Sequence, residues 1–169
     1  MNYFELFGIP VQLEVDTTAL TRKFFELSRT YHPDYHISLD EASRQEMLEK
    51  SSLVNRAWKT FRDPGLTIKY VLQLKGLLEE EEKYELPPDF LMEVLDINEQ
   101  LMDADDPGTK TGIRSAIDRL REEVYEPVKD IIRNYREGIT TEKELLDVKA
   151  YYYKQKYLDR IEREISEKK

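Results

Sequence analysis

Apolar residues recur at the spacing of an α-helix along almost all of this 169-residue chain. Leu20, Phe24, Leu27 and Tyr31, for example, follow one another at intervals of four, three and four residues, which places them on one face of a helix. No segment alternates apolar and polar residues with the period of two that a half-buried strand requires. The pattern therefore predicts an all-α protein.

Capping residues, prolines and glycines divide the N-terminal half into separate helices. Asn2 can cap a short helical turn, and Asp16 and Asp40 are placed to cap two long helices. Pro33 must end the first long helix, because proline has no amide hydrogen and restricts the residue before it. We expect the two long helices, which have matching apolar faces, to pack as an antiparallel hairpin followed by a shorter helix over 66–74.

The C-terminal half predicts three further helices. We expect a helix over 88–104, a loop over 105–112, and a long helix over 113–135 in which an internal proline introduces a kink. Thr140 or Thr141, with a glutamate shortly after it, forms a capping box for the last helix. Together the three helices predict a three-helix bundle.

The chain is expected to divide near residue 80. Residues 1–76 form the hairpin domain, residues 77–87 an acidic linker, and residues 88–169 the bundle. Four consecutive glutamates stand in the linker, and such a run is typical of a solvated segment without a function of its own.

Composition excludes several classes of partner and chemistry. The net charge is −9 and no basic patch is obvious, so we expect neither nucleic acid nor a membrane surface as a partner. The chain contains no cysteine, which excludes disulfides, thiolate chemistry and cysteine-ligated metals. No segment resembles a targeting leader or approaches membrane-spanning length. We expect a soluble cytoplasmic protein that holds no cofactor and no metal.

The stretch 29–37, RTYHPDYHI, contains both histidines of the chain. His32 and His36 are four residues apart, which suits two metal ligands on one helix face, but Pro33 removes that helix. Ser28 and Ser38 flank the stretch, yet nothing resembles a nucleophile elbow or an oxyanion hole. A His/Asp-dependent metal hydrolase stays an alternative. We instead expect no catalytic residue and a loop presented between two helices, with His36 as an ordinary loop residue.

The tripeptide 32–34, HPD, placed between two antiparallel helices, resembles the signature of the J-domain. J-domains are co-chaperone modules that stimulate ATP hydrolysis by DnaK-type chaperones. The segments 55–58, NRAW, and 61–64, FRDP, stand where J-domains have the core of the hairpin and its exit. A tripeptide alone has a high false-positive rate, and this context makes the resemblance specific.

Three further segments are similar to HscB-type proteins, the J-domain co-chaperones of iron–sulfur cluster biogenesis. They are the N-terminal MNYFELFGIP, the helix with YVLQLKG, and the segment DFLMEVLDINEQL. This resemblance covers both halves of the chain and implies an L-shaped arrangement of the two domains. The chain departs from the family at Tyr35, where lysine is common, and at Thr67, where arginine is common.

The resemblance implies a surface that docks on a DnaK/HscA-type chaperone. Its residues are His32, Pro33, Asp34, Arg22, Lys23 and Arg29. The histidine and the aspartate of the motif can also be interpreted as residues that merely cap and solvate a turn. The basic residues would raise the association rate and set the orientation of docking.

Helix 88–104 has more apolar residues than burial of one face needs. One row contains Phe90, Val94, Ile97 and Leu101, and a second row beside it contains Leu91, Leu95 and Met102. The second row is either part of a wide core stripe or an exposed binding face, and periodicity does not decide between them.

The resemblance favours a binding face for an IscU-type iron–sulfur scaffold protein. The positions that match are Leu91, Met92, Leu95, Asp96, Glu99, Asp103 and, on the last helix, Tyr157. The implied function is a co-chaperone, not an enzyme, that delivers the scaffold to the chaperone and stimulates its ATPase. A J-domain protein that serves a different client is the alternative.

Overall fold

The computed structural model describes residues 1–102 and 107–167. Within these residues the regular structure is helical throughout, which confirms the all-α prediction. The elements are α1 (Tyr3–Phe7), α2 (Thr17–Tyr31), η1 (Pro33–Tyr35), α3 (Glu41–Phe61), α4 (Pro64–Leu74), α5 (Pro88–Met102), α6 (Pro107–Tyr125), η2 (Glu126–Val128), α7 (Lys129–Arg133) and α8 (Glu142–Glu167).

Helix starts follow the capping residues of the sequence. The Asp16 carboxylate accepts the Ala19 amide at 3.2 Å, and the Asp40 carboxylate accepts the Ser43 amide at 2.7 Å. At the last helix, the Thr141 hydroxyl accepts the Glu144 amide at 3.1 Å, which assigns the predicted capping box to Thr141 rather than Thr140. These contacts satisfy amides that a helix N-terminus leaves without partners.

Prolines account for the boundaries that were predicted wrongly. Helix α4 begins at Pro64, not at residue 66, because proline suits the first position of a helix. For the same reason α6 begins at Pro107, so residues 107–112 are helix and not loop. The single kinked helix expected over 113–135 is in fact interrupted. Around Pro127 the chain forms the 3₁₀ turn η2, since proline removes a backbone hydrogen bond, and the short α7 ends at Arg133.

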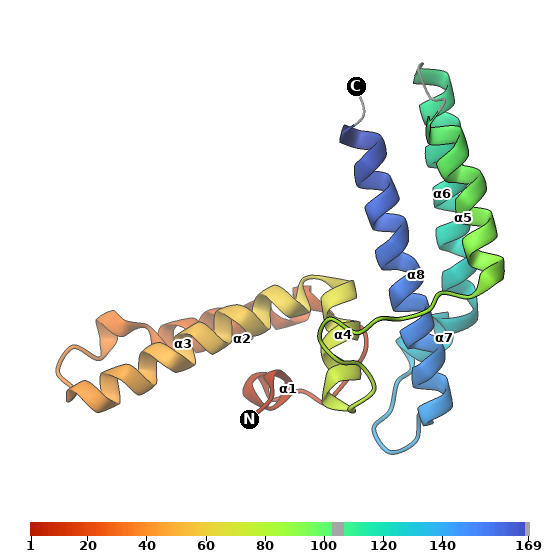
Figure 1. Ribbon diagram of the computed structural model, residues 1–169. Helices are drawn as coiled ribbons and strands as arrows, with labels where there is room; N and C mark the ends of the chain where they lie inside the picture. The colour runs from red at the N-terminus through yellow and green to blue at the C-terminus, as the bar shows by residue number, and fades with distance from the viewer. Residues whose placement is uncertain (103–106, 168–169) are drawn as a thin grey trace.

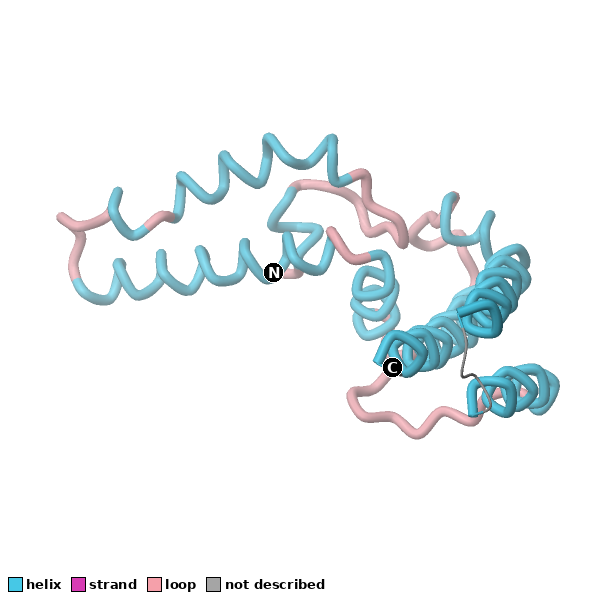
Figure 2. The backbone as a smooth tube through the Cα atoms, turned by 90° about the horizontal axis from the view of Figure 1, so that it is seen from above, coloured by secondary structure: helices cyan, strands magenta, loops and turns pink. Residues whose placement is uncertain are grey.

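The helices form two parts with different directions (Figure 1). Helices α2 and α3 lie side by side as a hairpin that projects sideways, and α5, α6 and α8 stand together as the upright bundle. Seen from above, the hairpin again extends away from the bundle, whose helices are viewed nearly end-on (Figure 2). The loop at the tip of the hairpin is therefore far from the bundle.

The first apolar core joins the two parts. It contains aromatic residues of the hairpin region, with the Trp58 ring stacked on Phe24 at a centroid distance of 4.7 Å. The same cluster includes Leu145 and Val148 from the beginning of α8. Because α8 contributes its first half to this core and its second half to the bundle, the long helix α8 connects the hairpin region to the bundle.

Thr67 is also part of this junction. Its side chain is 1% exposed, and its hydroxyl donates to the carbonyl oxygens of Thr60 and Asp63 at 2.8 and 3.1 Å. A buried hydroxyl needs such partners. The residue at this position therefore has a structural role at the corner between α3 and α4.

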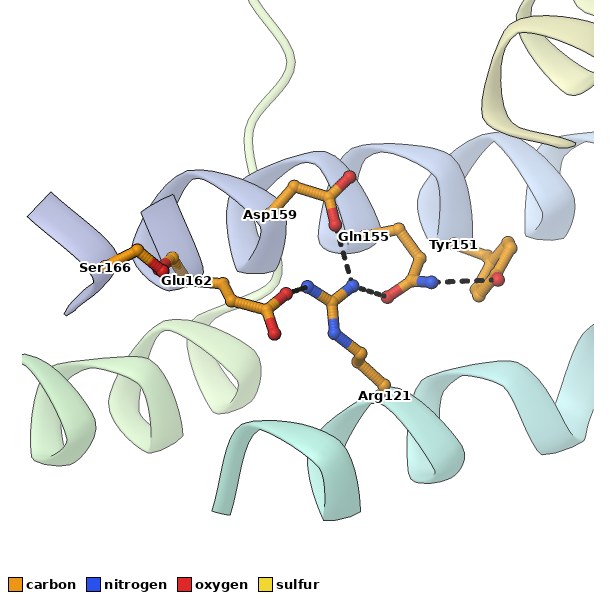
Figure 3. A network of polar contacts seen from close by, with 6 residues as sticks. All are labelled: Arg121, Tyr151, Gln155, Asp159, Glu162 and Ser166. Atoms are coloured by element: carbon orange, nitrogen blue, oxygen red, sulfur yellow. Dashed lines mark hydrogen bonds and ion pairs between the residues drawn. The ribbon is translucent and has the colours of Figure 1, made fainter. Parts of the chain in front are cut away.

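The second core holds α5, α6 and α8 together, and a polar network supports it (Figure 3). Arg121 of α6 donates to Gln155 at 3.0 Å and pairs with Asp159 at 2.8 Å and Glu162 at 2.6 Å, all three on α8. Hydrogen bonds to two carboxylates raise the pKa of the Arg121 guanidinium, although burial acts in the opposite direction. Arg121 thus fixes the alignment of α6 on α8.

The acidic linker is less solvated than its composition predicts. Glu80 accepts hydrogen bonds from Lys69 and Gln73 of α4, at 3.0 and 2.8 Å. Glu82 accepts one from Lys149 of α8 at 2.6 Å and one from Tyr153 at 3.2 Å. Two of the four glutamates therefore attach the linker to both neighbouring elements, while Glu79 and Glu81 are exposed as expected.

We predict that Glu82→Ala lowers the free energy of unfolding by about 1–2 kcal/mol, because it leaves the Lys149 ammonium without a partner. The Lys149 side chain is only 13% exposed, so water does not fully replace the carboxylate. Urea denaturation measures the difference. Glu79→Ala removes an exposed glutamate from the same run and serves as the matched control. Equal stabilities of the two variants would contradict the attachment.

The Glu82 contact should also depend on pH. The hydrogen bond from Lys149 lowers the pKa of the Glu82 carboxyl below its ordinary value of 4.5. A carboxyl with a lowered pKa in the folded state stabilises the protein above its unfolded value, and the stabilisation is lost as the pH falls through the folded-state pKa. The stability difference between wild type and Glu82→Ala should therefore be constant near neutral pH and shrink below about pH 4.5. A difference that grows on acidification would be inconsistent with this contact.

Candidate functional site

The HPD motif forms a defined turn at the tip of the hairpin, between α2 and α3 (Figure 1). Pro33 opens the 3₁₀ turn η1, and the His32 Nδ1 atom accepts the Asp34 amide at 3.2 Å. Because Nδ1 is an acceptor, the neutral imidazole holds its proton on Nε2. One Asp34 carboxylate oxygen lies 3.7 Å from His32 Nδ1. Among the described residues, neither Nε2 nor the Asp34 carboxylate takes part in a hydrogen bond, and both side chains are exposed, so both are available to a partner.

His36 has a specific contact that sequence reasoning missed. Its Nε2 atom lies 2.7 Å from the carbonyl oxygen of Thr30, in the last turn of α2. The His36 amide also donates to the Pro33 carbonyl at 3.0 Å. His36 therefore holds the turn against the helix end and is not an ordinary loop residue. The two imidazoles have different partners, and over the described ranges no three potential metal ligands converge.

Only two of the three basic residues predicted on α2 share one face of the helix. Arg22 and Arg29 are both exposed and share the outward face of the helix, with Glu26 between them. Lys23 is rotated from Arg22 by about 100° around the axis and is half-buried. The structure thus places two of the three predicted cations on the face that leads to the turn.

An open groove runs beside the turn. It is lined by Phe25, Ser28, Arg29, His32, Asp34 and Tyr35. The aromatic side chains of Phe25 and Tyr35 are 56% and 67% exposed, and the Tyr35 ring meets the His32 ring edge-on at 6.0 Å. Sequence reasoning missed Phe25, although its position outside the buried stripe of α2 was a usable signal. Tyr35 thus lines the groove directly beside the HPD motif.

Helix α5 presents a second candidate surface. Phe90, Val94, Ile97 and Leu101 are buried in the second core. In contrast, the side chains of Leu91, Met92 and Leu95 are 41%, 67% and 54% exposed. The interpretation of Leu91 and Leu95 as part of a wide core stripe is therefore wrong, because one row is enough to attach α5 to its neighbours.

Acidic side chains border this apolar surface. Asp96 and Glu99 are exposed on the outward side of α5. Asp103 lies outside the described residues. Tyr157 of α8 is half-buried, with its ring edge against Phe90 at 6.3 Å, and it lines a small groove together with Met102. Tyr157 thus lies beside Phe90 and the C-terminal end of α5. We call the exposed surface formed by Leu91, Met92 and Leu95 the α5 face.

A helical hairpin that presents a His-Pro-Asp turn, joined to a helical bundle, defines a J-domain co-chaperone. Residues 86–166 match a family model described as the HSCB C-terminal oligomerisation domain. The fold is similar to that of the chaperone HscB from Vibrio cholerae, with a TM-score of 0.74, 25% identity, and coverage of 98% of this chain and 96% of that chain. It is also similar to the human co-chaperone protein HscB, with a TM-score of 0.81, 27% identity, and coverage of 98% and 81%. The chain therefore resembles HscB co-chaperones over almost its whole length, and its C-terminal half matches the C-terminal domain of that family.

None of the helices within residues 1–102 and 107–167 is both long enough and apolar enough to cross a bilayer.

Proposed function

We propose that this chain is a non-enzymatic adaptor between two proteins. It binds an IscU-type iron–sulfur scaffold protein through the α5 face and a DnaK/HscA-type chaperone through the HPD turn, and it stimulates the ATPase of that chaperone. The observation that supports this most strongly is the presence of two exposed and separate surfaces on one chain. Similarity to HscB co-chaperones supports the same assignment.

The HPD turn is suited to docking because it is already ordered. Pro33 restricts the backbone, and the contacts of His32 and His36 hold the turn in one conformation. A preorganised turn loses little conformational entropy on binding. The Asp34 carboxylate can accept hydrogen bonds from an arginine or from backbone amides of the chaperone, and such charge-assisted bonds are strong. Stimulation is then allosteric, since the chaperone supplies the catalytic groups.

The α5 face is suited to a partner that offers an apolar patch. Three exposed apolar side chains form its centre, and Asp96 and Glu99 lie at its edge. Apolar anchors with a polar rim are typical of a helix face that binds a groove or patch on another protein. The acidic rim favours a partner with basic residues around the apolar contact.

The ATPase rate of a DnaK-type chaperone tests the proposal. We expect the chain alone to increase the rate, and the chain with the scaffold to increase it further than the sum of the two separate effects. A pull-down with the scaffold checks the client. No increase by the chain would overturn the chaperone assignment, and retention of another protein instead of the scaffold would indicate a different client.

A further inference from the structure

The fold creates a basic groove that the sequence pattern does not reveal. Between the linker and α8, an open groove is lined by the cationic residues Lys83, Lys156, Arg160 and Arg163, and by Glu82, Leu86, Tyr84, Tyr153 and Tyr157. The cations come from two segments about 70 residues apart along the chain. They therefore form a patch only in the folded protein, which has a net charge of −9.

The positive charge of this groove is largely uncompensated. Lys83, Lys156 and Arg163 form no ion pair or hydrogen bond over the residues that the structure describes. The Arg160 guanidinium pairs with Glu164 of its own helix at 3.5 Å. Glu82 is already neutralised by Lys149. Exposed cations without partners make a site favourable for an anionic ligand.

Some negative charge does lie near the groove. Lys156 contributes to the lowered pKa of the Glu80 carboxyl, although the hydrogen bond from Lys69 is the largest cause. Glu80 is held by Lys69 and Gln73, at 3.0 and 2.8 Å, on the side of α4. Glu80 therefore weakens the positive potential at one end of the groove and does not block the groove.

The arrangement of the cations indicates the shape of the ligand. Lys156, Arg160 and Arg163 follow one face of α8 over about 10 Å of helix axis, so they form a row and do not converge on one point. In an extended peptide, alternate side chains are about 6.6 Å apart, which is close to the spacing of about 6 Å between Lys156 and Arg160 along the axis. Tyrosine rings on the wall can pack against the side chains in between.

We propose that this groove binds an extended acidic peptide segment of a partner protein. Its carboxylates pair with the row of cations on α8, and its remaining side chains pack on Tyr84 and Tyr157. The groove lies beside the C-terminal end of α5, because Tyr157 and Arg160 also line the small groove at Met102. An acidic segment bound there would lie on the same helical bundle as the α5 face. The site does not depend on the proposed function of the α5 face.

Fluorescence anisotropy with a fluorescein-labelled decapeptide of alternating glutamate and tyrosine tests this proposal. We expect saturable binding that weakens as NaCl is increased, and no binding of the same peptide with glutamine in place of glutamate. The variant Lys156→Glu/Arg163→Glu should weaken binding by about tenfold or more, since it replaces two attractive charges by two repulsive ones.

The matched control is Lys143→Glu/Arg119→Glu, which makes the same change of net charge at two exposed positions outside the groove. This variant should bind the acidic peptide as the wild type does. Circular dichroism and urea denaturation verify that both variants fold. Equal losses in the two variants, or equal binding of the glutamine peptide, would overturn the proposal. Tighter binding of a ten-nucleotide single strand of DNA than of the acidic peptide would also overturn the proposal.

Discussion

Replacing His32 with glutamine is expected to remove the stimulation of the chaperone ATPase and to leave scaffold binding unchanged. Glutamine keeps a polar side chain but loses the rigid imidazole, whose Nδ1 accepts the Asp34 amide and leaves Nε2 for the proposed contact with the chaperone. The turn then no longer presents its donor and acceptor in one fixed geometry. We expect a reduction of at least about tenfold in the stimulated rate, which corresponds to about 1.4 kcal/mol or more.

His36, two residues after the HPD motif, offers a matched control. In His36→Gln, the amide nitrogen of glutamine can still donate to the Thr30 carbonyl, so the turn should stay attached to α2. This variant should keep most of the stimulation. Calorimetry of scaffold binding should give the wild-type affinity for both variants. Equal ATPase stimulation by His32→Gln and wild type would contradict the chaperone assignment.

The double substitution Leu91→Ala/Leu95→Ala is expected to weaken scaffold binding by about a hundredfold. Loss of a central apolar anchor typically costs more than 1 kcal/mol of binding free energy, and two such losses give about 2–3 kcal/mol. Both side chains are substantially exposed in the free chain, at 41% and 54%, so the free energy of unfolding should change little. Isothermal titration calorimetry measures the affinity.

Two other exposed leucines supply the control for this experiment. Leu48 on α3 and Leu146 on α8 have similar exposures and lie outside the α5 face. The variant Leu48→Ala/Leu146→Ala should bind the scaffold with unchanged affinity. If the Leu91→Ala/Leu95→Ala variant also binds normally, the α5 face is not the scaffold site.

Local features of the chain could be predicted because local chemistry determines them. Asp16, Asp40 and Thr141 cap helices through contacts with residues three positions away, so their roles follow from short-range spacing. The turn at Pro33 follows from the backbone of proline itself. Proline was also the source of error, since it can open a helix, as Pro107 does, as well as interrupt one, as around Pro127.

Features that depend on distant segments could not be predicted. Periodicity identified two apolar rows on α5, but only the positions of α6 and α8 decide that Phe90 is buried and Leu91 is exposed. The contact between Glu82 and Lys149, and the groove that brings Lys83 to α8, join residues that are far apart in the chain. Charge composition alone therefore indicated neither the attachment of the linker nor the basic groove.

In the proposed function both surfaces act through the same chain, and a mixing experiment tests this most directly. The His32→Gln chain keeps only the α5 face, and the Leu91→Ala/Leu95→Ala chain keeps only the turn. An equimolar mixture of both is compared with wild type in the chaperone ATPase assay with scaffold. We predict that wild type gives the extra scaffold-dependent stimulation and that the mixture gives only the rate of the leucine variant alone. Full wild-type stimulation by the mixture would contradict the account.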